Sequence, residues 1–228
     1  MHTGTVLVTG AGRGLGLEFA RQYAANGWRV IACCRSPDKA PELKKLGRHV
    51  EAHALEVTSQ DSIRHLAKAL NGTPVDVLIN NAGLHGDRRA FGETDAALWK
   101  QIFEVNTIAP YQVLAALVEN VAASTQKKVV NISSKVGSMG DGPSGGTYAY
   151  RSSKTALNMV MVNAAHELRN RGITILLIHP GWVQTDMGGP TAPVTIEQSI
   201  TGVRRIIDKA TPAESGHFYD YTGRQIPW

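Results

Sequence analysis

The stretch TVLVTGAGRGLG, residues 5–16, decides the fold of this 228-residue chain. Its first five residues are apolar or β-branched and predict a buried strand, the glycines predict a tight turn, and a helix is expected to begin near Leu15. Glycines in such a turn let the backbone approach a pyrophosphate, which then lies at the helix N-terminus. Because the turn follows the first strand of an alternating chain, it indicates a dinucleotide site. The residues expected there are Gly10, Arg13, Gly14, Leu15 and Gly16.

Short apolar runs recur along the rest of the chain, and helix-length stretches separate most of them. The predicted strands are Thr5–Thr9, Arg29–Cys34, Val50–Leu55, Val75–Asn80, Val129–Ser133 and Thr174–His179. This alternation predicts an α/β fold: a doubly wound, Rossmann-like parallel sheet of about seven strands, flanked by helices on both faces. No linker or repeat interrupts the pattern, so residues 1–228 are expected to form a single domain. Irregular segments that follow strands, at 84–94, 135–149 and 180–194, are expected at the carboxyl edge, where such sheets bind ligands.

The composition is that of an ordinary globular protein, since 43% of the residues are hydrophobic and 19% are charged. The sequence has no apolar run of about eighteen residues and no basic-then-apolar leader, so we expect a cytoplasmic protein that does not bind membranes. The adjacent Cys33 and Cys34 would point to opposite faces of a strand and not bridge, which is typical of a reducing compartment. The net charge of +5 is spread along the chain without a basic stripe, so no nucleic-acid partner is expected.

The end of the second predicted strand indicates which dinucleotide binds. An NAD site carries an acidic residue about twenty residues after the glycine turn, to hold the ribose 2′-hydroxyl. Here that strand is followed by Arg35, which would attract a 2′-phosphate, and Arg13 would reach the same group from the glycine turn. We therefore expect NADPH/NADP+, with NADH less favoured; the alternative is that both arginines are only solvated surface residues. Glu56, the nearest acid, and Val57 are expected near the adenine instead.

Tyr150 and Lys154 are four residues apart near the start of a predicted helix, so their side chains share one face. A free tyrosine has a pKa near ~10 and a lysine near ~10.4, so at neutral pH the charged lysine favours the tyrosinate. A phenol with a lowered pKa would serve as general acid for a ketone or general base for an alcohol. Such a pair is common by chance, and Tyr148 is a competing phenol, although position 152 is serine and gives it no lysine partner.

Five motifs in order resemble those of the short-chain dehydrogenase/reductase family. They are Thr9-Gly-x-x-x-Gly-x-Gly16, Asn80-Asn81-Ala82-Gly83, Ile132-Ser133-Ser134, Tyr150-x-x-x-Lys154 and Pro180-Gly181. The match covers essentially the whole chain. Residues 145–154, 179–187 and 226–228 more closely resemble the C-factor and sniffer-type carbonyl reductase branch. This resemblance implies hydride transfer between a nicotinamide cofactor and a carbonyl or alcohol.

The resemblance also implies a role for particular residues. Ser134 would position the substrate carbonyl, Tyr150 would transfer the proton, and Lys154 would hold the nicotinamide ribose and tune the tyrosine. Asn106 would anchor a water relay, although a structural asparagine that bends its helix is the alternative. Ser133 competes with Ser134 for the role of hydroxyl donor to the carbonyl oxygen, which gains negative charge as hydride arrives. The further cofactor contacts would be Asn81, Ala82 and Gly83 at the adenine ribose and Pro180, Gly181, Val183 and Thr185 at the nicotinamide.

The substrate pocket is expected to include His85, Val136, Met139, Trp182 and Met187. Several of these side chains are apolar, which favours aldehydes, ketones or quinones with a hydrophobic body, although ordinary packing is the alternative. The short loop after Pro180-Gly181 predicts an open site with broad specificity. The histidines at positions 53, 85 and 179 lack the spacing of metal ligands, so no metal is expected.

Two predicted helices, Ile108–Ala123 and Thr155–Leu168, are apolar around most of their circumference and so must be covered on two sides. We expect a homodimer or homotetramer through these helices; burial within the monomer is the alternative. The sequence thus predicts an NADPH-dependent carbonyl reductase or alcohol dehydrogenase that uses Tyr150 as general acid and base. The alternatives are an NAD-linked alcohol dehydrogenase and, because the C-factor relatives include a signalling protein, a cofactor-binding signal.

Overall fold

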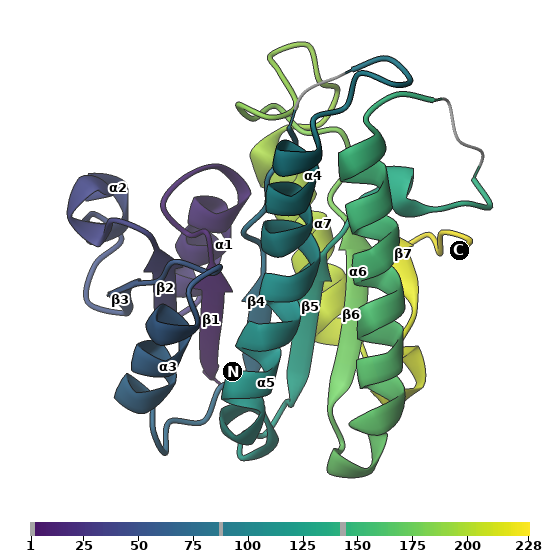
Figure 1. Ribbon diagram of the computed structural model, residues 1–228. Helices are drawn as coiled ribbons and strands as arrows, with labels where there is room; N and C mark the ends of the chain where they lie inside the picture. The colour runs from purple at the N-terminus through teal and green to yellow at the C-terminus, as the bar shows by residue number, and fades with distance from the viewer. Residues whose placement is uncertain (1–2, 87–88, 142–144) are drawn as a thin grey trace.

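The computed structural model describes residues 3–86, 89–141 and 145–228, and within these residues seven strands form one sheet (Figure 1). The strand order is β3-β2-β1-β4-β5-β6-β7, and every pairing is parallel. The strands are β1 Thr5–Thr9, β2 Arg29–Cys34, β3 Val50–Ala54, β4 Val77–Asn80, β5 Lys128–Ile132, β6 Thr174–His179 and β7 Phe218–Asp220. The chain order reverses between β1 and β4, and such a reversal leaves a crevice at the carboxyl ends of the two strands. The predicted doubly wound α/β fold is confirmed.

Helices cover both faces of the sheet (Figure 1). On one face lie α1 Gly14–Ala25 and α7 Ile196–Lys209; on the other lie α3 Gln60–Ala69, α5 Ala109–Ala122 and α6 Tyr148–Glu167. The helix α4 Ala96–Phe103 runs into α5 through a π-helical segment, Glu104–Ile108, and α2 Pro41–Lys44 is a single turn. In the described part of the chain, no helix is both long and apolar enough to cross a membrane.

Each face of the sheet has its own hydrophobic core. Successive side chains of a strand point to opposite faces, so Val6 and Val8 pack with Phe19 of α1, whereas Leu7 packs with Leu117 of α5. All of these side chains are essentially inaccessible to solvent. Burial on both faces explains why the central strands were visible in the sequence as continuous apolar runs, whereas the edge strand β3 is largely exposed.

The predicted bounds of β1, β2 and β6 are those of the structure, and the other strands differ by one or two residues at their ends. The sheet extends one strand beyond the six that were located in the sequence. This last strand, β7, has only three residues, and it pairs with β6 from Leu177 to His179. The helix α6 begins at Tyr148, which puts Tyr150 in its first turn.

Candidate active site

The glycine turn joins β1 to α1 at the crevice. Gly10 and Gly14 have φ angles of 68° and 55°, in the left-handed region that favours glycine. A Cβ at Gly16 would lie 2.2 Å from the carbonyl oxygen of Gly10, so the packing of the turn requires glycine there. A Cβ at Gly12, by contrast, would come no closer than 3.4 Å to any neighbour, the Cβ of Cys34. Packing alone therefore does not require glycine at position 12.

The first turn of α1 offers its backbone N–H groups to such a ligand. Arg13 occupies the N-cap position in an extended conformation, and its side chain makes no capping hydrogen bond to the helix. The first N–H groups of a helix have no partner within the helix and lie at the positive end of its dipole. The turn therefore has the chemistry of a phosphate site.

A threonine at the end of β1 holds the end of β4 against the glycine turn. The Thr9 hydroxyl accepts hydrogen bonds from the backbone amides of Asn81 at 3.0 Å and Ala82 at 3.1 Å. The Asn81 side chain donates back to the Thr9 carbonyl at 2.9 Å. These bonds place residues 81–83 beside the turn. Sequence reasoning did not assign this role to Thr9, although the residue opens the first motif.

The two arginines expected at the 2′-phosphate differ in their surroundings. Arg35 is exposed directly after β2, next to Cys34, which contacts Gly12. Arg13 donates from Nη1 to Oδ2 of Asp186 at 2.7 Å, and the two side chains are 80% and 81% exposed. This pair joins the glycine turn to the loop after β6 and was not expected from the sequence. An ion pair so exposed contributes about 0–1 kcal/mol to the free energy of unfolding. Because this pair is weak, a bound phosphate can displace Asp186 from Arg13.

The residues expected at the adenine have structural partners. The Glu56 carboxylate accepts hydrogen bonds from the backbone and the hydroxyl of Thr58, at 3.2 and 3.0 Å. The side chain of Val57 packs in the core beside Leu7. Contact between these two residues and a cofactor stays a prediction.

Ser134, Tyr150 and Lys154 meet where β5 ends and α6 begins. The Ser134 hydroxyl lies beside the Tyr150 phenol, close enough to act on the pKa of that phenol. The Lys154 Nζ lies 5.8 Å from the centre of the Tyr150 ring and donates to the carbonyl of Ile132, the last residue of β5, at 2.8 Å. The helix and the strand end thus bring a hydroxyl, a phenol and an ammonium group together, as the sequence predicted for these three residues.

Burial governs the protonation of this group. It raises the pKa of Tyr150 to about 12, although the Ser134 hydroxyl acts in the opposite direction. It also lowers the pKa of Lys154 to about 8. The sequence predicted a phenol with a lowered pKa, and this direction is wrong for the protein without ligand. The physical reason is that burial removes the hydration that would stabilise the phenolate.

The structure distinguishes Ser134 from its neighbour. The Ser133 hydroxyl donates to Oδ1 of Asn158 at 2.6 Å, in a buried contact between β5 and α6. Ser134 instead begins a short 3-10 turn, Lys135–Gly137, where its hydroxyl accepts from the Val136 amide at 3.4 Å, and it is the serine that acts on the pKa of Tyr150. Since Ser133 is engaged in packing, this geometry favours Ser134 as the donor to a substrate.

Asn106 is fully buried in the π-helical segment. Its Oδ1 accepts from the Leu84 amide at 2.8 Å, and its Nδ2 donates to the Leu84 carbonyl at 2.8 Å and to the Ser153 hydroxyl at 3.0 Å. The side chain thus ties the segment after β4 to the residue preceding Lys154. The π turn agrees with the structural alternative for Asn106, and the role in a water relay stays a prediction. Ser153 was not singled out in the sequence.

The loop after β6 folds back on itself near the glycine turn. The Pro180 carbonyl accepts from the Ser199 hydroxyl at 2.6 Å, and Gly181 has a φ of 92°. Val183 pairs with Val194, and the hydroxyl of Thr185 accepts from the Gly188 amide at 3.1 Å. These contacts bring the four residues expected at the nicotinamide into one ordered loop.

The residues expected around the substrate differ in how far they are exposed. The ring centres of His85 and Tyr150 are 4.5 Å apart, so His85 lies directly against the phenol. Val136 is half-buried, whereas Met139, Trp182 and Met187 are 71%, 55% and 50% exposed. In the part of the chain that the structure describes, no three side chains of the metal-binding types gather in a way that could hold a metal ion.

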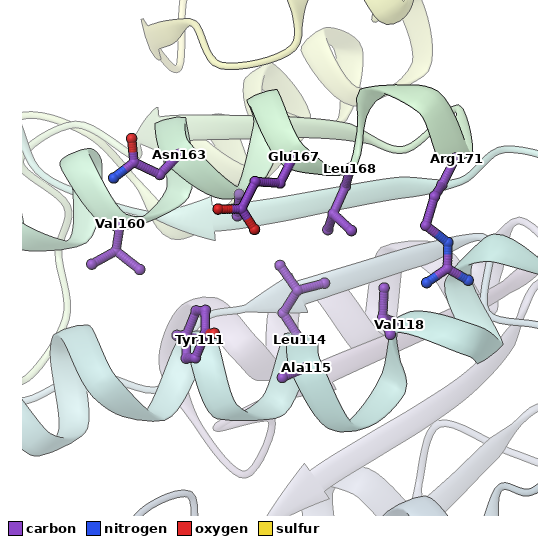
Figure 2. Close-up of a pocket in the computed structure, with 10 residues that line it drawn as sticks. Tyr111, Leu114, Ala115, Val118, Val160, Asn163, Glu167, Leu168 and Arg171 are labelled. Carbon is purple, nitrogen blue, oxygen red and sulfur yellow. The ribbon is translucent and has the colours of Figure 1, made fainter.

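A groove of about 440 Å³ lies away from this group of residues, between α5 and α6 (Figure 2). Tyr111, Leu114 and Val118 of α5 point toward Val160 of α6 and toward Leu168, the residue after that helix. It lies between the two helices that the sequence predicted a second subunit would cover.

The Rossmann-like fold, with a glycine turn at its crevice, is that of a nucleotide-dependent oxidoreductase. Residues 4–194 match the family model for short chain dehydrogenases, and the chain belongs to that family. It is 43% identical to the C-signal of Myxococcus xanthus over 155 residues, which are 68% of this chain and 93% of that protein.

Two solved structures extend the comparison to the full length of the chain. The carbonyl reductase Sniffer of D. melanogaster matches with a TM-score of 0.93 at 26% identity, and each chain is covered completely. An NADPH-bound carbonyl reductase from chicken fatty liver matches with a TM-score of 0.92 at 32% identity, again over the whole of both chains. The predicted resemblance to the C-factor and sniffer-type branch is confirmed.

Proposed function

We propose that this protein is an NADPH-dependent carbonyl reductase that converts an aldehyde, ketone or quinone to the alcohol. The observation that carries the proposal is the gathering of three groups where β5 ends and α6 begins: the Tyr150 phenol, the Ser134 hydroxyl beside it, and the Lys154 ammonium group 5.8 Å from the centre of the same ring. The NADPH-bound neighbour and the family membership support the choice of reaction class.

The residues at the crevice fit NADPH. The N-terminus of α1 lacks a side-chain cap, Gly12 is free of packing constraints, and Arg35 stands where an NAD site would carry a carboxylate. When bound, the nicotinamide supplies the hydride. The Lys154 ammonium group would donate hydrogen bonds to the hydroxyls of the nicotinamide ribose. The loop from Pro180 to Thr185 would hold the nicotinamide.

The protein's own residues supply the proton and stabilise the oxygen. The Ser134 hydroxyl donates to the carbonyl oxygen as negative charge develops on it. The Tyr150 phenol, which its high pKa keeps protonated at neutral pH, gives its proton to the same oxygen. Lys154, with a pKa of about 8, is still charged at neutral pH and stabilises the phenolate that remains. Asn106 keeps this arrangement in place through Leu84 and Ser153.

The proposed substrate class follows from exposed apolar side chains on the segments after β5 and β6. Met139, Trp182 and Met187 offer apolar surface, and none of them is buried. An open apolar site favours carbonyl compounds with a hydrophobic body and does not select strictly among them.

We also propose that the protein acts in the cytoplasm, where its two free cysteines stay reduced.

The test is the oxidation of NADPH or NADH in the presence of aryl and alkyl aldehydes, ketones and quinones, with wild type and Arg35→Asp. We expect several carbonyl compounds to be reduced and NADPH to be preferred. Arg35→Asp should weaken that preference about 10- to 100-fold, the ratio for one charge-assisted hydrogen bond. An unchanged preference would overturn the role of Arg35, and the absence of turnover with every compound would overturn the reductase.

The identity with the C-signal favours a second candidate, a cofactor-binding signalling protein. Such a protein would bind NADP+ without any need for the proton-transfer group. Cofactor binding that is measured by fluorescence, together with undetectable turnover across the panel, would favour this candidate over the reductase.

A further inference from the structure

The last residues of the chain contact the loop that follows Ser134. The Pro227 carbonyl accepts a hydrogen bond from the Ser138 hydroxyl at 2.6 Å, and the main-chain oxygen of Trp228 accepts one from the Gly140 amide at 2.5 Å. The Trp228 ring stacks on Phe218 of β7, with ring centres 5.8 Å apart. Figure 1 shows this C-terminal segment beside β7, on the same side of the molecule as the loop. Residues 226–228 are called the tail below.

The tail is itself fixed to the sheet. The Ile226 amide donates to the Phe218 carbonyl at 2.8 Å, and the Ile226 side chain is buried. A Cβ at Gly140 would lie 2.7 Å from the main-chain oxygen of Trp228 and 3.4 Å from Cβ of Pro227. Glycine at position 140 is therefore what allows the loop to approach the tail so closely.

The other end of the loop is fixed to the helix that carries Tyr150. The Thr155 hydroxyl donates to the Gly137 carbonyl at 2.9 Å, and a Cβ at Gly137 would lie 2.9 Å from the backbone of Lys154. An ion pair of 2.9 Å between Lys135 and Asp141 links the two ends of residues 135–141. The loop thus runs from the proposed proton-transfer group to the tail.

Met139 lies between the two residues that bind the tail. Ser138 is buried and Gly140 is pressed against Trp228, whereas the Met139 side chain is 71% exposed. One hydrogen bond on each side of Met139 holds its backbone in place, and this sets the point from which its exposed side chain leaves the loop. The tail therefore sets the position of Met139 relative to Ser134, the residue from which the loop begins.

We propose that the tail determines specificity: it positions Met139 as one wall of the substrate site and so sets how well bulky apolar carbonyl compounds bind. This inference rests on the proposed reductase function. Residues 226–228 are positioning residues in it, because they act through the loop and not on the reacting atoms.

The experiment compares three variants that disturb the contact in different ways. Ser138→Ala removes the hydrogen bond to Pro227, Gly140→Ala forces the loop and tail apart, and Trp228→Ala removes the stacking on Phe218. The substrates are a bulky aryl ketone and a small aliphatic aldehyde. We expect each variant to raise KM for the ketone about fivefold or more, which is the change in an equilibrium constant that corresponds to the free energy of one hydrogen bond. The values of kcat and of the Kd for NADPH should change less than twofold. The ratio of kcat/KM for the two substrates should shift toward the aldehyde.

Ser124→Ala is the matched control. The Ser124 hydroxyl is also buried, donates to a carbonyl, that of Val121, at 2.8 Å, and accepts from the amide three residues later, that of Lys127, at 3.1 Å. It precedes β5, at the opposite end of that strand from Ser134. The control should leave the substrate ratio unchanged. A ratio that shifts equally in Ser124→Ala, or does not shift in the three variants, overturns the proposal.

Hydrogen exchange separates this proposal from the proposed function, because it needs no turnover. Exchange of the Gly140 amide should accelerate about fivefold or more in Ser138→Ala and Trp228→Ala. If wild type reduces no carbonyl compound, the reductase is rejected and the specificity role with it, whatever the exchange shows. If wild type is active and the Gly140 amide exchanges at an unchanged rate in both variants, the tail does not hold the loop.

Discussion

Lys154 is a residue of the proposed site whose protonation is expected to change near pH 8. Burial lowers its pKa to about 8, so its ammonium form is lost as the pH rises through that value. The phenolate that Tyr150 leaves after proton transfer then has no cation beside it. The rate of carbonyl reduction should therefore fall as the pH rises above about 8, although Tyr150 itself, with a pKa of about 12, still holds its proton.

Lys154→Arg tests this assignment, because a guanidinium stays charged throughout the accessible pH range. We expect the variant to be slower at pH 7, since the larger group does not fit the bond to Ile132, and to lose the decline above pH 8. The measurement is the pH profile of kcat/KM for reduction. A decline with the same apparent pKa in the variant would mean that another group is responsible.

At the scale of elements, glycines of the turn between β1 and α1 are explained by two different needs: Gly16 by tight packing within the protein, and Gly12 by space for a ligand. Gly16→Ala puts a Cβ against the carbonyl of Gly10, so we expect the free energy of unfolding to fall by about 3 kcal/mol. Gly12→Ala meets only ordinary contacts, so its stability should stay close to that of wild type while the Kd for NADPH rises. Urea unfolding and cofactor titration of both variants check this. Equal loss of stability in the two would contradict the assignment of Gly12 to the ligand.

The elements that the sequence predicted well are those with a strong local signal. The strands β1, β2 and β6 are buried apolar runs, and Tyr150 with Lys154 is a spacing on one helix. Such features depend on neighbouring residues, so a pattern within a short window suffices.

Features that depend on distant contacts were not predicted. The strand β7 has three residues and exists because β6 offers it a partner, and the contact of the tail with Gly140 joins residues that are far apart in the sequence. The direction of the pKa shift of Tyr150 was also wrong, because burial is a property of the whole fold and not of the helix that carries the phenol. The ion pair between Arg13 and Asp186 was not predicted for the same reason, because it joins residues that are far apart in the sequence.

At the scale of the whole molecule, the outer side of α5 and α6 is the surface that the sequence predicted a second subunit would cover. It carries the groove of Figure 2, and Tyr111 and Met159 are 52% and 63% exposed there. We propose that this surface joins copies of the chain into a homodimer or homotetramer.

A charge placed on this surface should separate the subunits. We expect light scattering after size exclusion to give at least twice the mass of one chain for wild type and the mass of one chain for Tyr111→Glu. Lys44→Glu, on α2 at the other side of the sheet, controls for the added negative charge and should stay assembled. A monomeric wild type, or assembly that survives in Tyr111→Glu, would contradict this interface.

The most direct test of the proposed chemistry is the rate of hydride transfer in Tyr150→Phe, measured by mixing the NADPH complex rapidly with a carbonyl compound that wild type reduces. The variant keeps the aromatic ring against His85 and loses only the hydroxyl. We predict NADPH binding within twofold of wild type and a reduction rate lower by about 10²- to 10⁴-fold, the contribution of a general acid. Reduction at more than about a tenth of the wild-type rate, with NADPH still bound, would contradict the role of Tyr150 as proton donor.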